Sequence, residues 1–361
     1  MAAKPLEITV NKCTAGQLNP KPDENNLVFG KNFTDHMFTM RWNPNQGWHD
    51  AKVEPYRPFA LTPATLVFHY GQAIFEGMKA YRSPEGEIAF FRPKDNFARM
   101  SRSAHRICMP ELDEDAALRG LVALVDVDRD WVPRAPGATL YIRPVMIAVE
   151  PCVGLRAALD YLFFIIACPV GAYYPEGFKP THIYVEDKYV RAVPGGVGEA
   201  KTAANYAASV LAQKEAKEKG FSEVLWLDGV ERRHIEEVGT SNFFVVLDGE
   251  LVTPPLQGSI LPGITRDSVL KLAKSWGGPV TERRVSIDEL LEAAERGKLD
   301  ECFATGTAAV ISPIGELTYR GRKVVINGGE PGPLSRRLYD ELQDIQYGRR
   351  EDPFGWRMPL K

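Results

Sequence analysis

A glycine-rich loop between an expected strand and an expected helix constrains the fold of this chain more than any other stretch. Residues 182–192, HIYVEDKYVRA, are rich in β-branched and aromatic side chains and predict a strand. Residues 202–220, TAANYAASVLAQKEAKEKG, are rich in Ala, Glu, Lys and Gln and end at a glycine, which predicts a helix. The glycines of GGVG, residues 195–198, permit a sharp turn and a close approach of the backbone to another group. Lys201 is therefore expected at a strand-to-helix junction.

Two kinds of chemistry suit a lysine in this position. One is nucleotide binding by a P-loop, because the loop from Gly195 to Lys201 matches that pattern except for Ala200, and Asp228 could be a magnesium ligand. Ala200 places a Cβ where the loop must curl around phosphate, and Glu199 adds a negative charge beside it. The other is a Schiff-base lysine, which condenses with an aldehyde cofactor or a carbonyl substrate. The loop alone leaves both open.

The overall charge and hydropathy exclude several classes of partner. The chain has 44 basic and 47 acidic side chains, a net charge of -3, which gives no electrostatic basis for binding nucleic acid or an anionic membrane. The N-terminal residues lack an apolar signal core, and no stretch approaches the roughly 18 apolar residues of a membrane span. The five cysteines are scattered and indicate reduced, mostly buried thiols rather than a metal site. We expect a soluble cytoplasmic protein.

The length of 361 residues predicts two domains. Residues 171–181, GAYYPEGFKPT, are rich in Gly, Pro and aromatic residues between two regular regions, so they are the expected linker. We therefore expect an N-terminal α/β domain over residues 1–170, with an irregular arm over 1–30, and a larger α/β domain over 182–361.

Several ordered motifs resemble those of class IV pyridoxal-phosphate enzymes, and the whole set is similar to the branched-chain-amino-acid aminotransferases of the longer type. The signature begins at Glu237 and Asn242 and ends at the helix start after Gly263, and the resemblance extends from about residue 27 to the C-terminus. It implies a fold-type IV enzyme with two α/β domains. The other motifs are GGVGEAK, HYGQAIFEGMKAYR, YIRPVM, CPVGAYY and GTAAVISP.

The resemblance implies the cofactor pyridoxal 5'-phosphate, which withdraws electrons from the substrate Cα into a protonated pyridine ring. An acid must then hold the ring proton, and a helix start with a cation must hold the phosphate. Lys201 would both anchor the cofactor and carry the proton from Cα. By resemblance, the cofactor-binding residues are Lys201, Arg99, Tyr206, Glu237, Thr240, Ile264, Thr265, Thr307 and Arg191.

The same resemblance implies the substrates, which are leucine, isoleucine or valine on one side and 2-oxoglutarate and glutamate on the other. Tyr141 and Arg143 alternate along one strand, so both side chains face the same side of it. The arginine would pair with the side-chain carboxylate of glutamate in an otherwise apolar pocket. The implied substrate-binding residues are Phe29, Tyr70, Phe75, Tyr141, Arg143, Leu155 from the partner subunit of a homodimer, Tyr173, Thr307 and Ala308.

One position departs from part of this family. Some members carry a Cys-x-x-Cys redox switch after the Gly-Thr-Ala turn, where this chain has Ala309 and Ser312. Thiol regulation at that place is therefore excluded. Three alternatives remain beside the branched-chain enzyme: a D-amino-acid aminotransferase, an aminodeoxychorismate lyase and the P-loop nucleotide binder.

Overall fold

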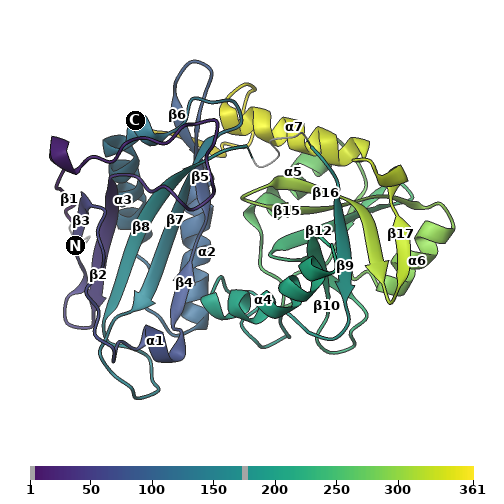
Figure 1. Cartoon of the computed structure of the whole chain (residues 1–361), viewed down its shortest axis with the longest axis horizontal. Helices are drawn as coiled ribbons and strands as arrows, with labels where there is room; N and C mark the ends of the chain where they lie inside the picture. The colour runs from purple at the N-terminus through teal and green to yellow at the C-terminus, as the bar shows by residue number, and fades with distance from the viewer. Residues whose placement is uncertain (1–4, 173–177) are drawn as a thin grey trace. The chain divides into compact units, whose positions relative to one another are not determined.

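The structure, a computed structural model, describes residues 5–172 and 178–361 (Figure 1). The expected substrate residue Tyr173 and part of the expected linker lie outside these ranges. The chain forms two compact units. Unit 1 contains Met1–Tyr173, Ala200–Ala203 and Asp344–Lys361, and unit 2 contains Tyr174–Glu199 and Ala204–Gln343. The sequence predicts one domain boundary, near residue 171. In the structure, the segments Ala200–Ala203 and Asp344–Lys361 also belong to unit 1.

Unit 1 is built on one mainly antiparallel sheet, which has nine strands among the described residues. Its order is β1-β3-β2-β8-β7-β5-β6-β18, and β4 pairs with β7. Only the short edge strand β1 runs parallel to its neighbour among these pairs. The strands are β1 (Thr9–Val10), β2 (His36–Asn43), β3 (Gly47–Pro55), β4 (Ala73–Phe75), β5 (Met78–Arg82), β6 (Ile88–Phe91), β7 (Thr139–Ala148), β8 (Tyr161–Val170) and β18 (Arg357–Pro359).

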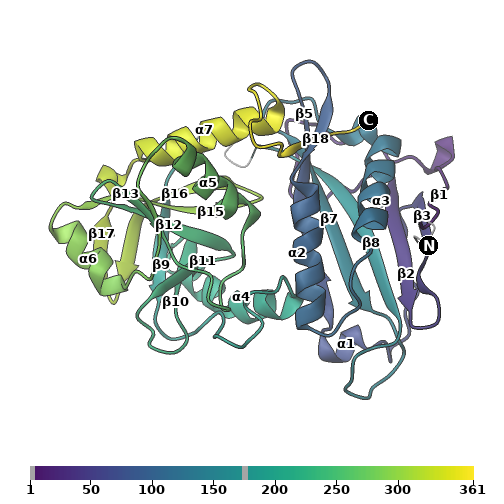
Figure 2. The ribbon, with the colours of Figure 1, turned by 180° about the vertical axis from the view of Figure 1, so that it is seen from behind.

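Two helices, α2 (Pro93–Arg106) and α3 (Glu114–Val127), pack against each other on one face of this sheet (Figure 2). Strand β7 shows how the two faces differ. Its residues Leu140, Ile142 and Met146 are fully buried in the core beneath the helices. Since side chains alternate along a strand, Tyr141 and Arg143 face the opposite side, as the sequence predicts. A short helix, α1 (Val67–Tyr70), precedes β4.

Unit 2 is a barrel with helices around it (Figure 1). The path β11-β10-β9-β16-β15-β12 closes because β11 also pairs with β12. Ile183, Leu225 and Val245 belong to its buried core. The strands are β9 (Thr181–Glu186), β10 (Glu223–Leu227), β11 (Ile235–Val238), β12 (Ser241–Leu247), β13 (Glu250–Thr253), β14 (Val280–Glu282), β15 (Leu299–Gly306), β16 (Val310–Tyr319) and β17 (Arg322–Val325). The remaining α-helices are α4 (Ala203–Glu218), α5 (Ile264–Ser275), α6 (Ile287–Glu295) and α7 (Pro333–Tyr347).

The helix after the glycine loop is confirmed, but the strand before it is shorter than expected. Helix α4 ends at Glu218, two residues before Gly220, which has a φ of +88° that favours glycine. Strand β9 ends at Glu186, because its carboxylate Oε1 accepts the backbone N–H groups of Lys188 and Tyr189 and turns the chain. Arg191 is therefore on a loop and not on a strand. No helix in the described ranges combines the length and apolarity needed to cross a membrane.

Candidate active site

The peptide around Lys201 is fixed to unit 1 by its own backbone. The carbonyl oxygen of Lys201 accepts the N–H of Phe75 at 3.0 Å, and its N–H donates to the hydroxyl of Ser103 at 2.9 Å. The hydroxyl of Thr202 donates to the carbonyl oxygen of Ala73 at 2.8 Å. These bonds join the end of the glycine loop to strand β4 and helix α2. The lysine is thus held by elements that lie far earlier in the chain.

The amine of Lys201 lies in surroundings that disfavour its charged form. Its Nζ is 4.7 Å from the centre of the Phe75 ring. Burial, and then the positive charge of Arg99, lower the pKa of Lys201 from its ordinary 10.5 to about 8. A lysine with this pKa has a substantial neutral fraction near neutral pH, and the neutral amine is the nucleophile.

Arg99 is buried on α2 and forms a bidentate ion pair with Glu76. Its Nε and Nη2 lie 2.8 Å from the two carboxylate oxygens of Glu76, and the two side chains are 5% and 0% exposed. The sequence predicted Arg99 as a cofactor residue but not its acidic partner. The signal was available, because a buried charge needs an opposite charge and Glu76 stands in the quoted motif FEGMKAYR.

Arg143 lies among aromatic rings on the face of the sheet opposite the helices. Its guanidinium carbon is 4.8 Å from the Phe75 ring centre and 5.3 Å from that of Tyr141, and its Nη2 donates to the Tyr141 hydroxyl at 2.9 Å. The rings of Phe29 and Tyr141 pack edge to face at 4.9 Å. The Tyr141 hydroxyl reaches this place only because residue 77 is glycine, since a Cβ there would lie 2.2 Å from it. Four of the predicted substrate residues therefore form one aromatic cluster with a single cation.

Two predicted substrate residues stand apart from this cluster. Tyr70 is 43% exposed, and its hydroxyl donates to the carbonyl oxygen of Val153 at 2.5 Å. Leu155 is 80% exposed, the most exposed of the large apolar side chains in the described chain. No described contact joins either residue to Arg143.

In unit 2, Glu237 is a buried carboxylate in the tight hairpin between β11 and β12. The spacing Glu-x-Gly-x-x-Asn places Glu237 directly across from Asn242, and the amide of Asn242 donates to Oε1 of Glu237 at 3.0 Å. Oε2 of Glu237 lies 2.5 Å from Nη2 of Arg191. The side chains of this ion pair are 3% and 7% exposed, so the pair is almost dry.

Arg191 is held in place by backbone carbonyls of two loops. Its Nη2 donates to the carbonyl oxygen of Ser259, and to that of Gly198 at 3.4 Å. A Cβ at residue 198 would lie 2.2 Å from the Ser259 carbonyl oxygen. The third glycine of the loop is therefore needed for close packing of the two segments that hold Arg191.

A small cavity beside Glu237 collects four of the predicted cofactor residues. It is lined by Arg191, Tyr206, Glu237 and Thr240, together with Asn205, Ser209, Gly239 and Leu261, which the sequence did not single out. Asn205 supports the glycine loop, because its amide donates to the carbonyl oxygen of Val197 at 2.8 Å.

The remaining predicted residues occupy a helix start and a turn. Ile264 and Thr265 are the first two residues of α5, after the N-cap Gly263. The first turn of a helix presents N–H groups without intrahelical partners and a partial positive charge, which suits phosphate. Thr307 and Ala308 form the turn between β15 and β16. Asp228, the magnesium ligand of the P-loop alternative, instead accepts backbone N–H groups within its own turn.

The chain matches the family described as Amino-transferase class IV over residues 73–317. It is 53% identical to branched-chain-amino-acid aminotransferase 2 of Bacillus subtilis, over 93% of each chain. The branched-chain amino acid aminotransferase of Thermobaculum terrenum in its PLP form has a TM-score of 0.74 at 28% identity, covering 91% of this chain and 98% of that one. The Escherichia coli branched-chain amino acid aminotransferase has a TM-score of 0.74 at 27% identity, covering 91% and 99%. A further branched-chain amino acid aminotransferase, solved in complex with N-(5'-phosphopyridoxyl)-L-glutamate, has a TM-score of 0.73 at 26% identity, covering 89% and 98%.

Proposed function

This chain belongs to the class IV aminotransferases, and from that premise we propose that it transfers the amino group of leucine, isoleucine or valine to 2-oxoglutarate, giving the branched 2-oxo acid and glutamate. The observation that carries the proposal is the place of the Lys201 amine, which lies 4.7 Å from the Phe75 ring that the Arg143 guanidinium also contacts. Two relatives more than half identical over nearly the whole chain are named branched-chain-amino-acid aminotransferase 2 and probable branched-chain-amino-acid aminotransferase.

Pyridoxal 5'-phosphate is the cofactor that the family implies, and the chain contains the donor groups that it needs. Its aldehyde needs a neutral amine, its ring nitrogen needs a buried carboxylate, and its phosphate needs N–H groups and a cation. Lys201, Glu237 and the start of α5 at Ile264 and Thr265 supply these in turn, with Arg99, Tyr206, Thr240 and Thr307 as further contacts. When bound, the cofactor supplies an electron sink for the bonds at the substrate Cα.

Lys201 has two tasks in the proposed reaction. Its neutral amine holds the cofactor before substrate arrives, and afterwards its Nζ takes the proton from the substrate Cα. Both tasks need a nitrogen that gains and loses a proton near neutral pH, which is the property that burial and Arg99 give it.

Glu237 would hold the proton of the pyridine nitrogen, with Arg191 beside it. The Arg191 guanidinium lies 2.5 Å from Oε2 of Glu237 and offsets the cost of burying this carboxylate away from water. Asn242 fixes its second oxygen, so the orientation of the acid is set before the cofactor arrives.

The aromatic cluster suits two unlike side chains. Phe29, Phe75 and Tyr141 offer apolar surface to a branched aliphatic side chain, and Arg143 offers a cation to the γ-carboxylate of glutamate. The glutamate adduct bound in one of the solved relatives supports glutamate as the second substrate. The backbone of Thr307 and Ala308 would hold the α-carboxylate.

A homodimer completes this proposal. Leu155 and Val153 are 80% and 64% exposed and lie on the segment to which Tyr70 is hydrogen-bonded. Their exposure leaves both side chains available to a partner subunit, and the dimer itself is what the resemblance to the family implies. In the proposed dimer, Leu155 reaches the substrate pocket of the partner subunit. The proposed location of the enzyme is the cytoplasm.

The direct test is spectroscopic. The purified protein should absorb visible light as a pyridoxal-phosphate enzyme, and leucine should convert that band in a single turnover that 2-oxoglutarate reverses. Borohydride reduction and peptide mapping should then place the cofactor on Lys201. A protein that stays colourless with added cofactor, or a label on another lysine, would overturn the proposal.

A further inference from the structure

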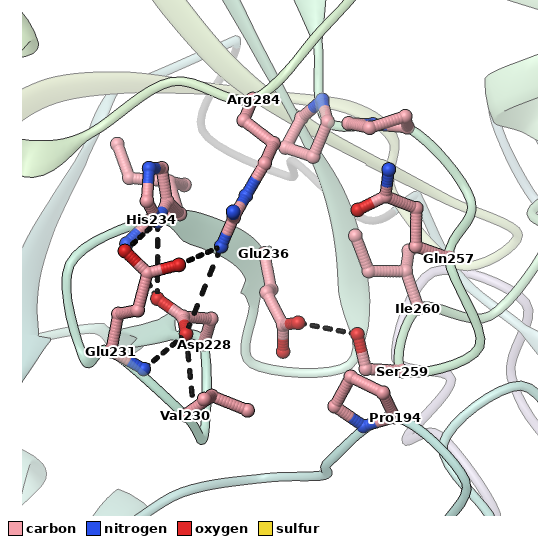
Figure 3. A pocket seen from close by; sticks show the side chains of 13 residues that line it. Pro194, Asp228, Val230, Glu231, His234, Glu236, Gln257, Ser259, Ile260 and Arg284 are labelled. Carbon is pink, nitrogen blue, oxygen red and sulfur yellow. Dashed lines mark hydrogen bonds and ion pairs between the residues drawn. The ribbon is translucent and has the colours of Figure 1, made fainter.

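A second cavity lies in unit 2 and shares no residue with the cavity beside Glu237. Its volume is about 250 Å³, slightly below the roughly 300–1,000 Å³ typical of drug-sized ligands, so it suits a ligand of a few non-hydrogen atoms. Figure 3 shows its lining, which is Pro194, Asp228, Val230, Glu231, His234, Ile235, Glu236, Pro254, Pro255, Gln257, Ser259, Ile260 and Arg284.

Glu236 and His234 line this cavity, and each has a buried polar atom without a hydrogen bond among the described residues; Glu236 is the more buried of the two. It is 6% exposed, and its Oε1 accepts a hydrogen bond from the Ser259 hydroxyl. Its Oε2 is buried and has no hydrogen-bond partner among the residues that the structure describes. Figure 3 shows the carboxylate between the side chains of Asp228 and Ser259. A buried carboxylate oxygen without a donor is costly, so this atom is suited to accept a hydrogen bond from a ligand.

Different residues of β11 line the two cavities. Glu236 lines this one and Glu237 the other, and the two linings have no residue in common. A molecule bound at Glu236 therefore does not take the place of a cofactor at Glu237.

The charge of the lining favours a cation. Three carboxylates, those of Asp228, Glu231 and Glu236, face a single guanidinium, that of Arg284. Burial raises the pKa of Glu236, against the hydrogen bond from Ser259 and the positive charge of Arg191. A bound cation would add to the partial compensation that Arg191 and Arg284 give this carboxyl group.

A bare metal ion fits this place less well than an organic cation. Ligand atoms of Asp228, Glu231 and His234 do lie within 4.8 Å of one another. However, both oxygens of Asp228 already accept backbone N–H groups, and Arg284 Nη2 is 3.0 Å from Glu231. The guanidinium therefore already neutralises this corner. The rest of the wall includes the polar Gln257 and Ser259, but Pro254, Pro255 and Ile260 form an apolar part that suits a hydrocarbon body.

We propose that this cavity binds a small organic ammonium ion, which donates its N–H to Oε2 of Glu236 and packs its hydrocarbon part against the proline wall. The binding does not depend on the transaminase activity, so its test is a binding measurement. N-methylpyrrolidinium is a suitable probe, because a tertiary amine has one N–H in its cationic form and cannot condense with an aldehyde cofactor.

The experiment titrates the holoenzyme with N-methylpyrrolidinium chloride and follows the ligand by saturation-transfer NMR. The wild type should bind with a millimolar dissociation constant. Glu236→Gln keeps the shape and the bond from Ser259 but removes the charge, and it should weaken binding about tenfold or more, since hydrogen bonds to charged groups are the strong ones. The matched control Glu231→Gln, at the 48%-exposed carboxylate, should change binding less than about twofold.

Cyclopentanol, a neutral molecule of similar size, should bind at least about tenfold more weakly than the cation. Equal binding of Glu236→Gln and wild type, equal binding of cyclopentanol, or no binding by the wild type would each overturn the proposal. A crystal structure of the wild-type complex gives a test that needs no variant. The probe nitrogen should lie within hydrogen-bonding distance of Glu236 Oε2, and a probe bound only elsewhere would refute the assignment.

Discussion

Replacing Arg143 with Met should separate the two halves of the proposed reaction. Methionine keeps an unbranched chain that can pack against Phe75 and Tyr141, but it removes the cation and the 2.9 Å hydrogen bond to the Tyr141 hydroxyl. Glutamate would then bring its γ-carboxylate into an aromatic pocket without a partner. Leucine makes no use of the charge and would lose only a little packing.

The size of the effect follows from the burial of the arginine. Breaking a fully buried charge pair costs about 3–5 kcal/mol. Arg143 is only partly buried, so we expect about 2–4 kcal/mol, which is a loss of about 30-fold to 1,000-fold in the glutamate half-reaction at about 1.36 kcal/mol per factor of ten. The leucine half-reaction should change less than about fivefold.

Single-turnover absorbance measurements with each amino acid separate these rates, because each half-reaction changes the spectrum of the cofactor on its own. Arg143→Lys serves as the control, since it keeps a charge while losing the planar contact with both rings, and it should recover part of the glutamate rate. Equal losses for leucine and glutamate in Arg143→Met would refute the reasoning and make Arg143 a structural residue.

Three further predictions concern the cofactor residues. Lys201→Ala should abolish transamination while thermal melting stays at or above that of the wild type, because the change removes a partly buried amine; a large loss of melting temperature would contradict this. Glu237→Gln should retain cofactor but lose at least about a hundredfold in kcat, or about 2.7 kcal/mol, and near-normal turnover would argue against the ring-acid role. Capture of pyridoxal phosphate by the apoenzyme should rise with pH through about 8, because the neutral fraction of Lys201 rises as the amine loses its proton. If the midpoint of this rise lay close to the ordinary lysine pKa of 10.5, the pKa of the amine would not be perturbed.

Local patterns predicted the helices and the hairpins well. The Asp248-Gly249 pair predicts a tight turn, and both residues have positive φ values of 52° and 79° between β12 and β13. The Pro262-Gly263 pair predicts a helix start, and α5 begins at Ile264. Spacings of this kind work because the turn geometry depends on a few adjacent residues.

Contacts between distant parts of the chain could not be predicted in this way. Glu76 and Arg99 are 23 residues apart, and nothing in their separation shows that they form a bidentate pair. Arg191 was placed on a strand because residues 187–192 have β-forming side chains, yet Glu186 binds two backbone N–H groups and ends the strand first. The hydrogen bonds to the Glu186 side chain therefore outweigh the β propensity of the residues that follow it.

Two buried ion pairs, Glu76 with Arg99 and Glu237 with Arg191, allow the protein to keep two carboxylates buried before any cofactor is bound. Each buried carboxylate is neutralised within its own unit, Glu76 by Arg99 in unit 1 and Glu237 by Arg191 in unit 2. Burial lowers the pKa of Lys201 to about 8, which increases the neutral fraction of its amine near neutral pH. Removing the cofactor therefore leaves neither of these carboxylates uncompensated, and the apoenzyme should keep the circular dichroism spectrum of the holoenzyme. A cofactor-free protein that unfolds would show that bound phosphate is needed to balance charge at one of these pairs.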